Sequence, residues 1–250
     1  MKLFHRLAAP FRAALRGLSP VMAPLDGSAA YPSPPELRVP EELKRAVDEE
    51  SRRKAGIFEA IYAGAEGGGA KPPWDYGAVR PQLREWAEAR NLAGGGREAL
   101  VVGCGYGSDA EYLAQLGFRT TAFDFSPTAI AAARRQHPGS EVDYFVADVL
   151  DLPGDWLGRF DLVVESLTVQ SMPPDQHSAA ARSIAALVAP GGTLLVLATT
   201  RDEGAVVQGP PWPLTRAELD DFAQDDLTLR QVERIADGTW WGAELSRDSS

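Results

Sequence analysis

The sequence predicts an α/β fold, with a doubly wound, mostly parallel sheet. Strand-like and helix-like segments alternate from residue 82 to the end of the chain, the pattern of a parallel sheet with helices on both faces. The first strand runs into Gly103, Gly105 and Gly107 and then directly into a helix, which lets backbone N–H groups approach a ligand closely. The next three strands each end in an acidic residue, at the edge where open parallel sheets bind ligands.

Local signals mark where these elements start. Ser126 followed by Pro127 starts one helix, because Pro fits the first helical turn. Thr215 with Glu218 three residues later forms a capping box that starts another. Helices are expected over residues 82–90, 109–116, 127–135, 175–188 and 215–222, and strands over 100–102, 118–123, 142–148, 159–165, 193–198, 227–235 and 239–245.

Asp124 gives the glycine loop a more specific meaning. It ends the second strand, 21 residues after Gly103, close to the spacing of about 20 at which a carboxylate binds ribose hydroxyls in nucleotide-binding sheets. A carboxylate suits this role because it accepts a hydrogen bond from each hydroxyl. The alternatives are a solvated turn residue or a helix cap, but Ser126 already supplies the cap. Asp148 and Glu165 end the third and fourth strands, so three acids meet at one edge.

Five segments, in this order, resemble the class I S-adenosylmethionine-dependent methyltransferases. They are residues 101–107 (VVGCGYG), 123–130 (FDFSPTAI), 147–149 (ADV), 160–165 (FDLVVE) and 187–195 (LVAPGGTLL). The resemblance spans roughly residues 72–247. It implies a Rossmann-like, doubly wound, mostly parallel seven-stranded sheet whose last two strands form an antiparallel C-terminal hairpin.

A narrower likeness lies upstream, in residues 72–77 (PPWDYG). This segment is similar to the Pro-Trp-Asp-x-Gly segment of small-molecule methyltransferases of the thiopurine, thiol and halide type. There the Trp packs on the cofactor or roofs the substrate pocket, and an indole face attracts a sulfonium cation. The alternative is that Trp74 only pins an N-terminal segment to the core.

The resemblance implies S-adenosylmethionine as the cofactor and a set of residues that bind it. The set is Trp74, Gly103, Cys104, Gly105, Tyr106, Gly107, Asp124, Phe125, Ser126, Asp148, Val149, Glu165 and Ser166. In this assignment the glycine loop meets the amino-acid part of the cofactor and Asp124 meets the ribose. Phe125 packs on the adenine, Asp148 accepts from its amino group, and Val149 offers a backbone N–H.

Residues 168–174 follow the fourth strand and are expected to face the substrate. Gln170 is the first candidate catalytic residue, for orienting the nucleophile, with Tyr76 and Tyr106 behind it. His177 is expected to face solvent. Because no general base stands out, the pattern favours a nucleophile that is ionised before it binds, such as a thiolate.

Composition favours some classes of function over others. The chain has 250 residues with 25 basic and 35 acidic side chains, and this acidic balance argues against nonspecific nucleic-acid binding. Cys104 is the single cysteine, so no intramolecular disulfide can form, and a cytoplasmic location is expected. Because Cys104 lies within the glycine loop, it is expected to be a small buried residue and not a nucleophile. The three histidines form no metal-ligand spacing, so no metal site is expected.

The N-terminal region is expected to be separate. Residues 1–45 form a basic, amphipathic extension followed by a Pro-rich linker, and residues 46–250 form the methyltransferase domain, with 46–80 as a lid segment. Residues 1–21 allow four interpretations: a membrane-surface helix, a targeting segment, a mobile arm or a lid helix. A helix is expected over 41–62, and the glycine-rich stretch 64–71 is expected to be mobile.

The sequence therefore predicts methyl transfer from S-adenosylmethionine to O, N or S of a small molecule. Two alternatives stay open at this stage. One is a catalytically inactive cofactor-binding partner subunit. The other is a nicotinamide-dependent dehydrogenase, although such enzymes usually carry Gly-x-Gly-x-x-Gly, whereas here a single residue separates Gly105 from Gly107.

Overall fold

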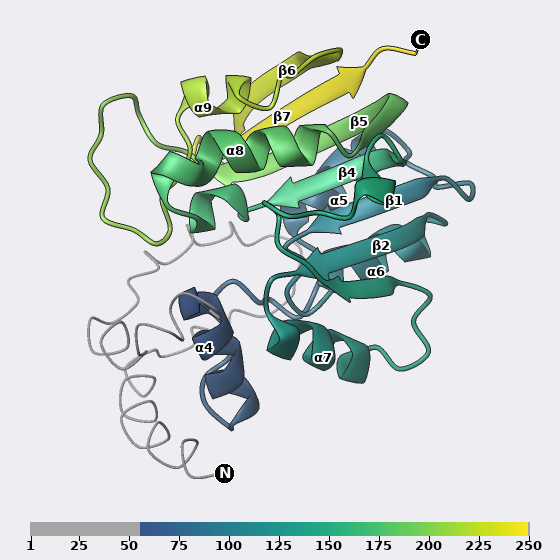
Figure 1. Cartoon of the computed structure of the whole chain (residues 1–250), viewed down its shortest axis with the longest axis vertical. Helices are drawn as coiled ribbons and strands as arrows, with labels where there is room; N and C mark the ends of the chain where they lie inside the picture. The colour runs from purple at the N-terminus through teal and green to yellow at the C-terminus, as the bar shows by residue number, and fades with distance from the viewer. Residues whose placement is uncertain (1–55, 250) are drawn as a thin grey trace.

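A computed structural model describes residues 56–249, and the N-terminal extension 1–45 lies outside that range. The strands are β1 (Glu98–Val102), β2 (Arg119–Asp124), β3 (Asp143–Val146), β4 (Phe160–Ser166), β5 (Val188–Thr199), β6 (Leu227–Ile235) and β7 (Trp240–Arg247). They form one seven-stranded sheet in the order β3-β2-β1-β4-β5-β7-β6. The first five strands are parallel, and β7 runs antiparallel to both β5 and β6 (Figure 1). The predicted fold class, including the C-terminal hairpin, is confirmed.

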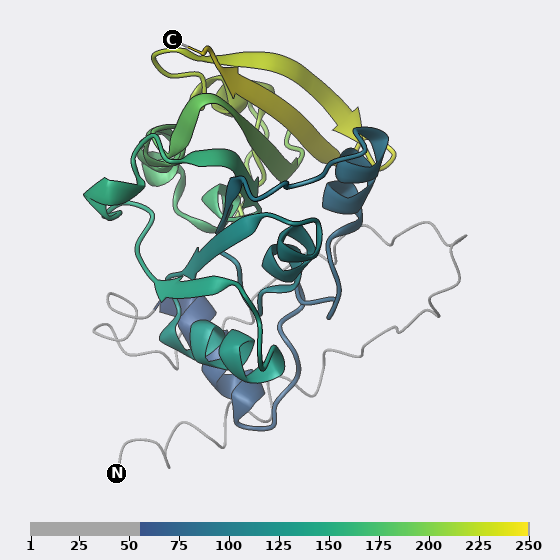
Figure 2. The same ribbon diagram turned by 90° about the vertical axis from the view of Figure 1, so that its right-hand side faces the viewer.

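Helices cover both faces of the sheet. The helices are α4 (Gly56–Glu66), α5 (Pro81–Ala89), α6 (Ser108–Gln115), α7 (Pro127–Gln136), α8 (Pro174–Ala185) and α9 (Arg216–Asp220), with short 3-10 turns η2 (Gly154–Trp156) and η3 (Val169–Ser171). Figures 1 and 2 show α4 lying beside α7, away from the hairpin of β6 and β7.

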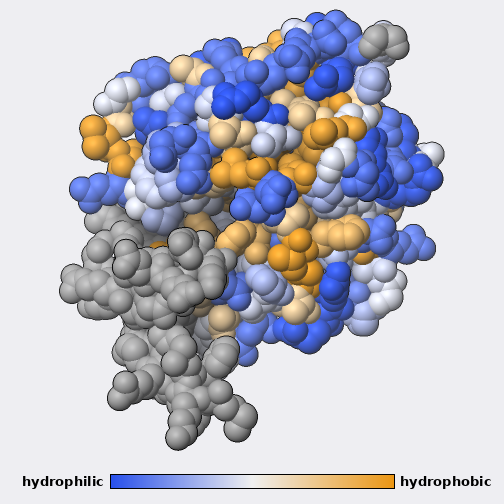
Figure 3. All heavy atoms as spheres, in the orientation of Figure 1, coloured by the Kyte–Doolittle hydropathy of each residue, from blue (hydrophilic) through white to orange (hydrophobic). Residues whose placement is uncertain are grey.

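Alternation along the strands builds two cores. In β1, Leu100 and Val102 point to the core shared with Ile184 of α8, whereas Ala99 and Val101 point to the core shared with Leu113 of α6. This period of two is what a strand buried on both faces requires. The face of the molecule in Figure 3 is mixed, with apolar residues among the polar ones.

The structure corrects several predicted boundaries. Strand β5 begins at Val188, five residues before the predicted start, and α8 ends at Ala185 instead of 188. Strand β3 ends at Val146, so Asp148 lies in the following turn, bridged to Asp151, and does not end the strand. Helix α4 extends to Glu66 and takes in the start of the stretch expected to be mobile.

The first part of the helix expected over 41–62 lies outside the described residues. Among residues 56–249, no helix is long and apolar enough to cross a membrane.

Candidate active site

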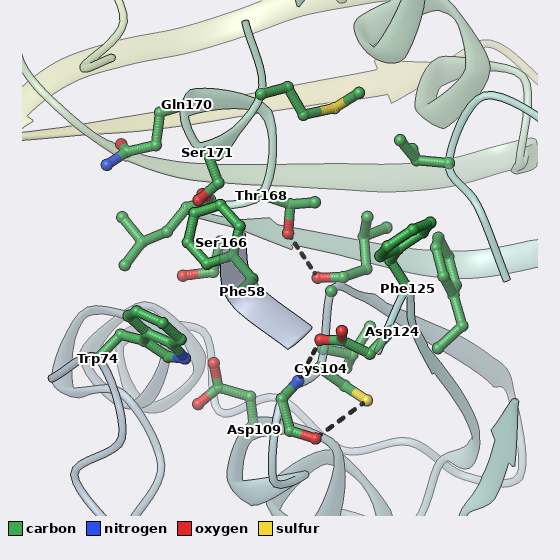
Figure 4. A pocket seen from close by; sticks show the side chains of 18 of the residues that line it. Phe58, Trp74, Cys104, Asp109, Asp124, Phe125, Ser166, Thr168, Gln170 and Ser171 are labelled. Carbon is green, nitrogen blue, oxygen red and sulfur yellow. Dashed lines mark hydrogen bonds between the residues drawn. The ribbon is translucent and has the colours of Figure 1, made fainter. Parts of the chain in front are cut away.

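A cleft of about 380 Å³ opens at the carboxyl ends of β1, β2 and β4. Its floor is the glycine loop that joins β1 to α6, and its walls come from α4, from residues 74–80, from the turns after β2 and β3, and from residues 166–173. The side chains of Phe58, Trp74, Asp109, Asp124 and Gln170 converge on it from these separate segments (Figure 4). This is the edge at which ligands of open parallel sheets bind.

The glycine loop is shaped by neighbouring protein side chains. Gly103, Gly105 and Gly107 all have positive φ, at 60°, 53° and 89°, which favours glycine. A Cβ on Gly103 would lie 2.2 Å from the hydroxyl oxygen of Thr168, and one on Gly107 would lie 2.2 Å from the hydroxyl oxygen of Tyr144. A Cβ on Gly105 would lie 2.8 Å from the Tyr62 hydroxyl oxygen, so packing as well as backbone conformation favours glycine at all three positions.

Asp124 joins the glycine loop to the end of β2. One carboxylate oxygen accepts from the Gly105 N–H and the other from the Ser126 N–H, both at 2.9 Å. The side chain lines the cleft, yet the residue is only 8% exposed. Burial raises the pKa of Asp124 to about 6, against the two hydrogen bonds, which lower it. Since each oxygen can accept a second hydrogen bond, the carboxylate remains able to bind a ligand hydroxyl.

The far end of the cleft is formed by the turns after β2 and β3. Phe125 and Asp148 are exposed there, and Val149 is buried. Asp148 accepts a hydrogen bond from the Leu150 N–H at 2.9 Å, which fixes its carboxylate beside the opening. A partly exposed aromatic ring next to a fixed carboxylate can hold a flat ring that carries an amino group.

An aromatic cluster around Trp74 forms one wall of the cleft. Trp74 donates from its indole N–H to the hydroxyl of Tyr62 at 2.8 Å, and its ring packs edge-on against Phe58 at 5.3 Å. Tyr62 in turn packs against Tyr106 at 5.2 Å. Burial raises the pKa of Tyr106 to about 12, so its hydroxyl stays protonated at neutral pH. Tyr76, the other candidate tyrosine, is 42% exposed at the rim.

Arg80 and Asp109 form a buried ion pair in the cleft that the sequence did not reveal. The backbone N–H of Arg80 donates to one carboxylate oxygen of Asp109 at 2.7 Å. The guanidinium Nε of Arg80 lies 3.8 Å from the other carboxylate oxygen. The Arg80 side chain is 11% exposed, and its Nε has no hydrogen-bond partner. The nearest anion to this closed-off N–H is the Asp109 carboxylate, so the pair fixes a positively charged side chain in the wall of the cleft.

The segment after β4 forms the remaining wall. Glu165 accepts from the N–H groups of Thr168 and Val169 at 2.7 and 3.0 Å, so its carboxylate shapes this segment instead of reaching the cleft. Burial raises the pKa of Glu165 to about 7, although both hydrogen bonds lower it. Gln170 lines the cleft, and its side-chain oxygen accepts from both the N–H and the hydroxyl of Thr199. Because a backbone N–H can only donate, the Gln170 NH₂ group is the end left for a ligand.

Most of the residues proposed from the sequence line the cleft. Those that do are Trp74, Tyr76, Gly103, Cys104, Gly105, Tyr106, Asp124, Phe125, Asp148, Val149, Ser166 and Gln170. Gly107, Ser126 and Glu165 do not line it. Ser126 caps α7 by accepting from the Ala129 N–H and donates to Glu59, so its hydroxyl is already engaged. Cys104 is only partly buried, not fully buried as predicted, and desolvation raises the pKa of its thiol, which keeps it protonated.

The prediction that His177 faces solvent is wrong. The residue is 2% exposed, and its two ring nitrogens lie 2.8 Å from Glu218 and 2.9 Å from the Met172 carbonyl. Helix α8 begins at Pro174, so position 177 falls in its first turn, on the side that α9 covers. The local sequence does not show which side that is, because α9 lies about 40 residues further along the chain.

Comparisons with known proteins agree with this geometry. A family model described as a methyltransferase domain matches residues 99–192. The 2-heptyl-1-hydroxyquinolin-4(1H)-one methyltransferase of Mycobacteroides abscessus is 29% identical over 192 residues, which cover 73% of this chain and 83% of that protein. The ubiquinone biosynthesis O-methyltransferase of Xanthomonas axonopodis is 35% identical over 130 residues; the chain spans about half of that relative, 53% of its length.

Solved structures give the same result. One described as "Conversion of a Disulfide Bond into a Thioacetal Group during Echinomycin Biosynthesis" has a TM-score of 0.63 at 28% identity, covering 77% of this chain and 91% of that one. The 1,6-didemethyltoxoflavin-N1-methyltransferase of Burkholderia thailandensis, solved with S-adenosylhomocysteine, has a TM-score of 0.57 at 21% identity, covering 93% and 95%, which shows the shared fold.

The family model and the two relatives named above are methyltransferases, which favours that class over the nicotinamide-dependent dehydrogenases that a glycine loop also allows. The narrower likeness of residues 72–77 to the thiopurine type stays a prediction. With its sheet order, glycine loop and family match together, the chain belongs to the class I S-adenosylmethionine-dependent methyltransferases, enzymes that here act on a small molecule.

Proposed function

We propose that this enzyme methylates an acidic hydroxyl, present as its anion, on a flat aromatic or heteroaromatic small molecule. The feature that most supports this class is the pairing of aromatic walls with a hydrogen-bond donor. Phe58 and Trp74 offer ring surface to a planar acceptor, and the Gln170 NH₂ group offers a donor to an anionic oxygen. In the part of the chain that the structure describes, no histidine lines the cleft. An acceptor that is already ionised needs no general base.

The names of two relatives support the same class. One names a 1-hydroxyquinolin-4(1H)-one, a flat heterocycle with an acidic N-hydroxyl, and the other names O-methylation in ubiquinone biosynthesis. Methylation at N or S is the alternative, and the echinomycin and toxoflavin proteins are the structural neighbours that keep it open. The thiopurine-type role of Trp74, as a roof over cofactor or substrate, belongs to this proposal.

The residues of the cleft fit the cofactor. Gly103–Gly107 would hold its amino-acid portion, with the guanidinium of Arg80 as a partner for the carboxylate. Asp124 would accept from the ribose hydroxyls, and Phe125, Asp148 and Val149 would hold the adenine. Ser166 would stand near the methyl donor, whereas Ser126 and Glu165 act indirectly, by shaping the chain beside it.

Catalysis then rests on alignment and exclusion of water. When bound, S-adenosylmethionine supplies a methyl group on a sulfonium centre for in-line displacement. Gln170 orients the acceptor oxygen through its NH₂ group, with Tyr76 at the rim of the cleft and Tyr106 in its buried lining. The ring of Trp74 excludes water from the reacting atoms and presents an aromatic face to positive charge.

Two measurements test the proposal in sequence. Calorimetric titration with S-adenosylhomocysteine is expected to give micromolar affinity, and NADH as the comparison ligand is expected to give none. With labelled methyl donor, 2-heptyl-1-hydroxyquinolin-4(1H)-one is expected to be methylated. The control compound 2-heptylquinolin-4(1H)-one lacks the N-hydroxyl and is expected not to be methylated. Binding of the cofactor product without transfer to any phenol, amine or thiol would indicate a catalytically inactive partner subunit.

The Gln170→Glu variant tests the donor. It keeps the oxygen that accepts from Thr199 and replaces the NH₂ group with a second carboxylate oxygen. An anionic acceptor is repelled by that oxygen, so its KM is expected to rise by about tenfold or more while the affinity for S-adenosylhomocysteine is kept. An unchanged KM contradicts the role given to Gln170.

We propose further that the enzyme works in the cytoplasm on small molecules and does not bind nucleic acid. One cysteine and a formal charge of −10 support this. The proposed domain division keeps residues 46–250 as the methyltransferase domain with 46–80 as its lid segment, and residues 1–45 as an extension. Cell fractionation and activity of the 46–250 fragment test these two points.

A further inference from the structure

We propose that His177 is a positioning residue, which holds residues 168–173 in the shape that acceptor binding requires. These residues supply Gln170, Met172 and other parts of the acceptor side of the cleft. His177 lies behind them, in the first turn of α8, and does not line the cleft. Its effect on acceptor binding therefore passes through the loop, and the inference rests on the acceptor class proposed above.

Both ring nitrogens of His177 lie within hydrogen-bond distance of an acceptor. The Met172 carbonyl can only accept, so Nε2 donates to it at 2.9 Å. The Glu218 carboxylate also accepts, so Nδ1 donates to it at 2.8 Å. The ring therefore links the Met172 carbonyl at the end of the loop to the Glu218 carboxylate on α9.

The groups around His177 keep Glu218 ionised. Burial by itself raises the pKa of Glu218. The hydrogen bonds from Thr215 and from His177, together with the charge of Arg201, lower it by more, so the pKa lies below its ordinary value. Arg201, from the segment after β5, donates to Glu218 at 2.7 Å. Glu203 in that segment is bound to the Ala217 N–H. The carboxylate that orients His177 is thus fixed by α9 and by the end of β5.

The loop is anchored at both ends and in the middle. Glu165 holds its start through the N–H groups of Thr168 and Val169, and the Gln170 carbonyl accepts from the Trp212 N–H at 2.6 Å. His177 holds its end, at the Met172 carbonyl. The two residues that follow are Pro173 and Pro174, which have no N–H to anchor the chain. Losing the His177 contact would leave the Met172 carbonyl without its donor and loosen this end of the loop, which the Met172 N–H bond to the Val169 carbonyl would still hold.

Two isosteric variants separate the two contacts. In His177→Gln the amide nitrogen takes the place of Nε2 and can still donate to Met172. In His177→Asn the amide nitrogen takes the place of Nδ1 and can still donate to Glu218, while the Met172 carbonyl loses its donor. With 2-heptyl-1-hydroxyquinolin-4(1H)-one as acceptor, KM is expected to rise about tenfold in His177→Asn and to stay within about threefold in His177→Gln. The affinity for S-adenosylhomocysteine is expected to stay the same in both.

A second readout does not depend on the acceptor. Hydrogen exchange of the Ser171 and Met172 amides is expected to be faster in His177→Asn than in His177→Gln. Equal exchange and equal KM in the two variants, with only a common drop in Tm, would show that His177 merely stabilises the packing of α8. If the acceptor is not methylated by the wild type but exchange differs as expected, the proposed acceptor fails and the positioning role stands.

Discussion

One carboxylate oxygen of Asp124 accepts a hydrogen bond from the N–H of Gly105 at 2.9 Å, so the end of β2 is tied to the middle of the glycine loop. This contact positions a buried anion at the floor of the cleft without using all of its hydrogen-bonding capacity. The same residue therefore shapes the loop and remains available to a ligand. These two roles have different consequences for substitution.

Replacing Asp124 by Ala is expected to weaken S-adenosylhomocysteine binding by about 100-fold, since two charge-assisted hydrogen bonds are lost. The wild-type affinity is also expected to weaken as the pH falls through about 6, where the carboxylate becomes protonated. Calorimetry between pH 5 and 8 measures both effects. A pH profile that is the same in the Asp124→Ala variant would mean that another group titrates.

Arg80 is expected to recognise the amino-acid end of the cofactor. Arg80→Met also leaves Asp109 without its ion-pair partner, so a general loss of structure must be distinguished from a lost ligand contact. The control ligand is 5′-methylthioadenosine, which lacks the amino-acid portion. The variant should bind S-adenosylhomocysteine at least tenfold more weakly. It should bind 5′-methylthioadenosine as the wild type does. Equal weakening for both ligands would place the role of Arg80 in the ion pair with Asp109 alone.

Trp74 is expected to contribute to binding as well as to packing. Trp74→Ala removes the ring that faces the cleft and should raise the acceptor KM or weaken cofactor binding by about tenfold. Tyr62→Phe is the matched control, because it removes only the hydroxyl that accepts from the Trp74 indole at 2.8 Å. If Trp74→Ala lowers Tm but leaves both affinities unchanged, Trp74 serves only to pin its segment.

Glu165 is expected to make the folded state less stable as the pH rises. Its folded pKa, about 7, lies above the ordinary value of 4.5, so the unfolded chain loses the proton first. Stability attributable to this group is present below pH 4.5 and is lost as the pH rises to 7, by about 3 kcal/mol. Glu165→Gln keeps an oxygen for the Thr168 and Val169 N–H groups and cannot ionise. Relative to the wild type it should gain stability between pH 4 and pH 8, as urea unfolding would show; a constant difference contradicts the buried charge.

The alternation of strands and helices, the glycine loop and the capping box at Thr215 were all predictable from the sequence. These features depend on contacts between residues close in the chain, so the spacing of residue types along the sequence indicates them directly. The spacing from Gly103 to Asp124 carried long-range information only because the turn, helix and strand between them have standard lengths. That is why the fold and most of the lining of the cleft were anticipated.

Tertiary structure alone decided which polar groups meet. Arg80 pairs with Asp109 because α5 and α6 pack on the same face of the sheet, and His177 is buried because α9 covers one side of α8. Glu165 ends a strand as the pattern indicated, but its carboxylate turns to two N–H groups in the following loop. Local periodicity specifies the face of an element, whereas the partner of a polar side chain depends on how separate elements are placed against each other.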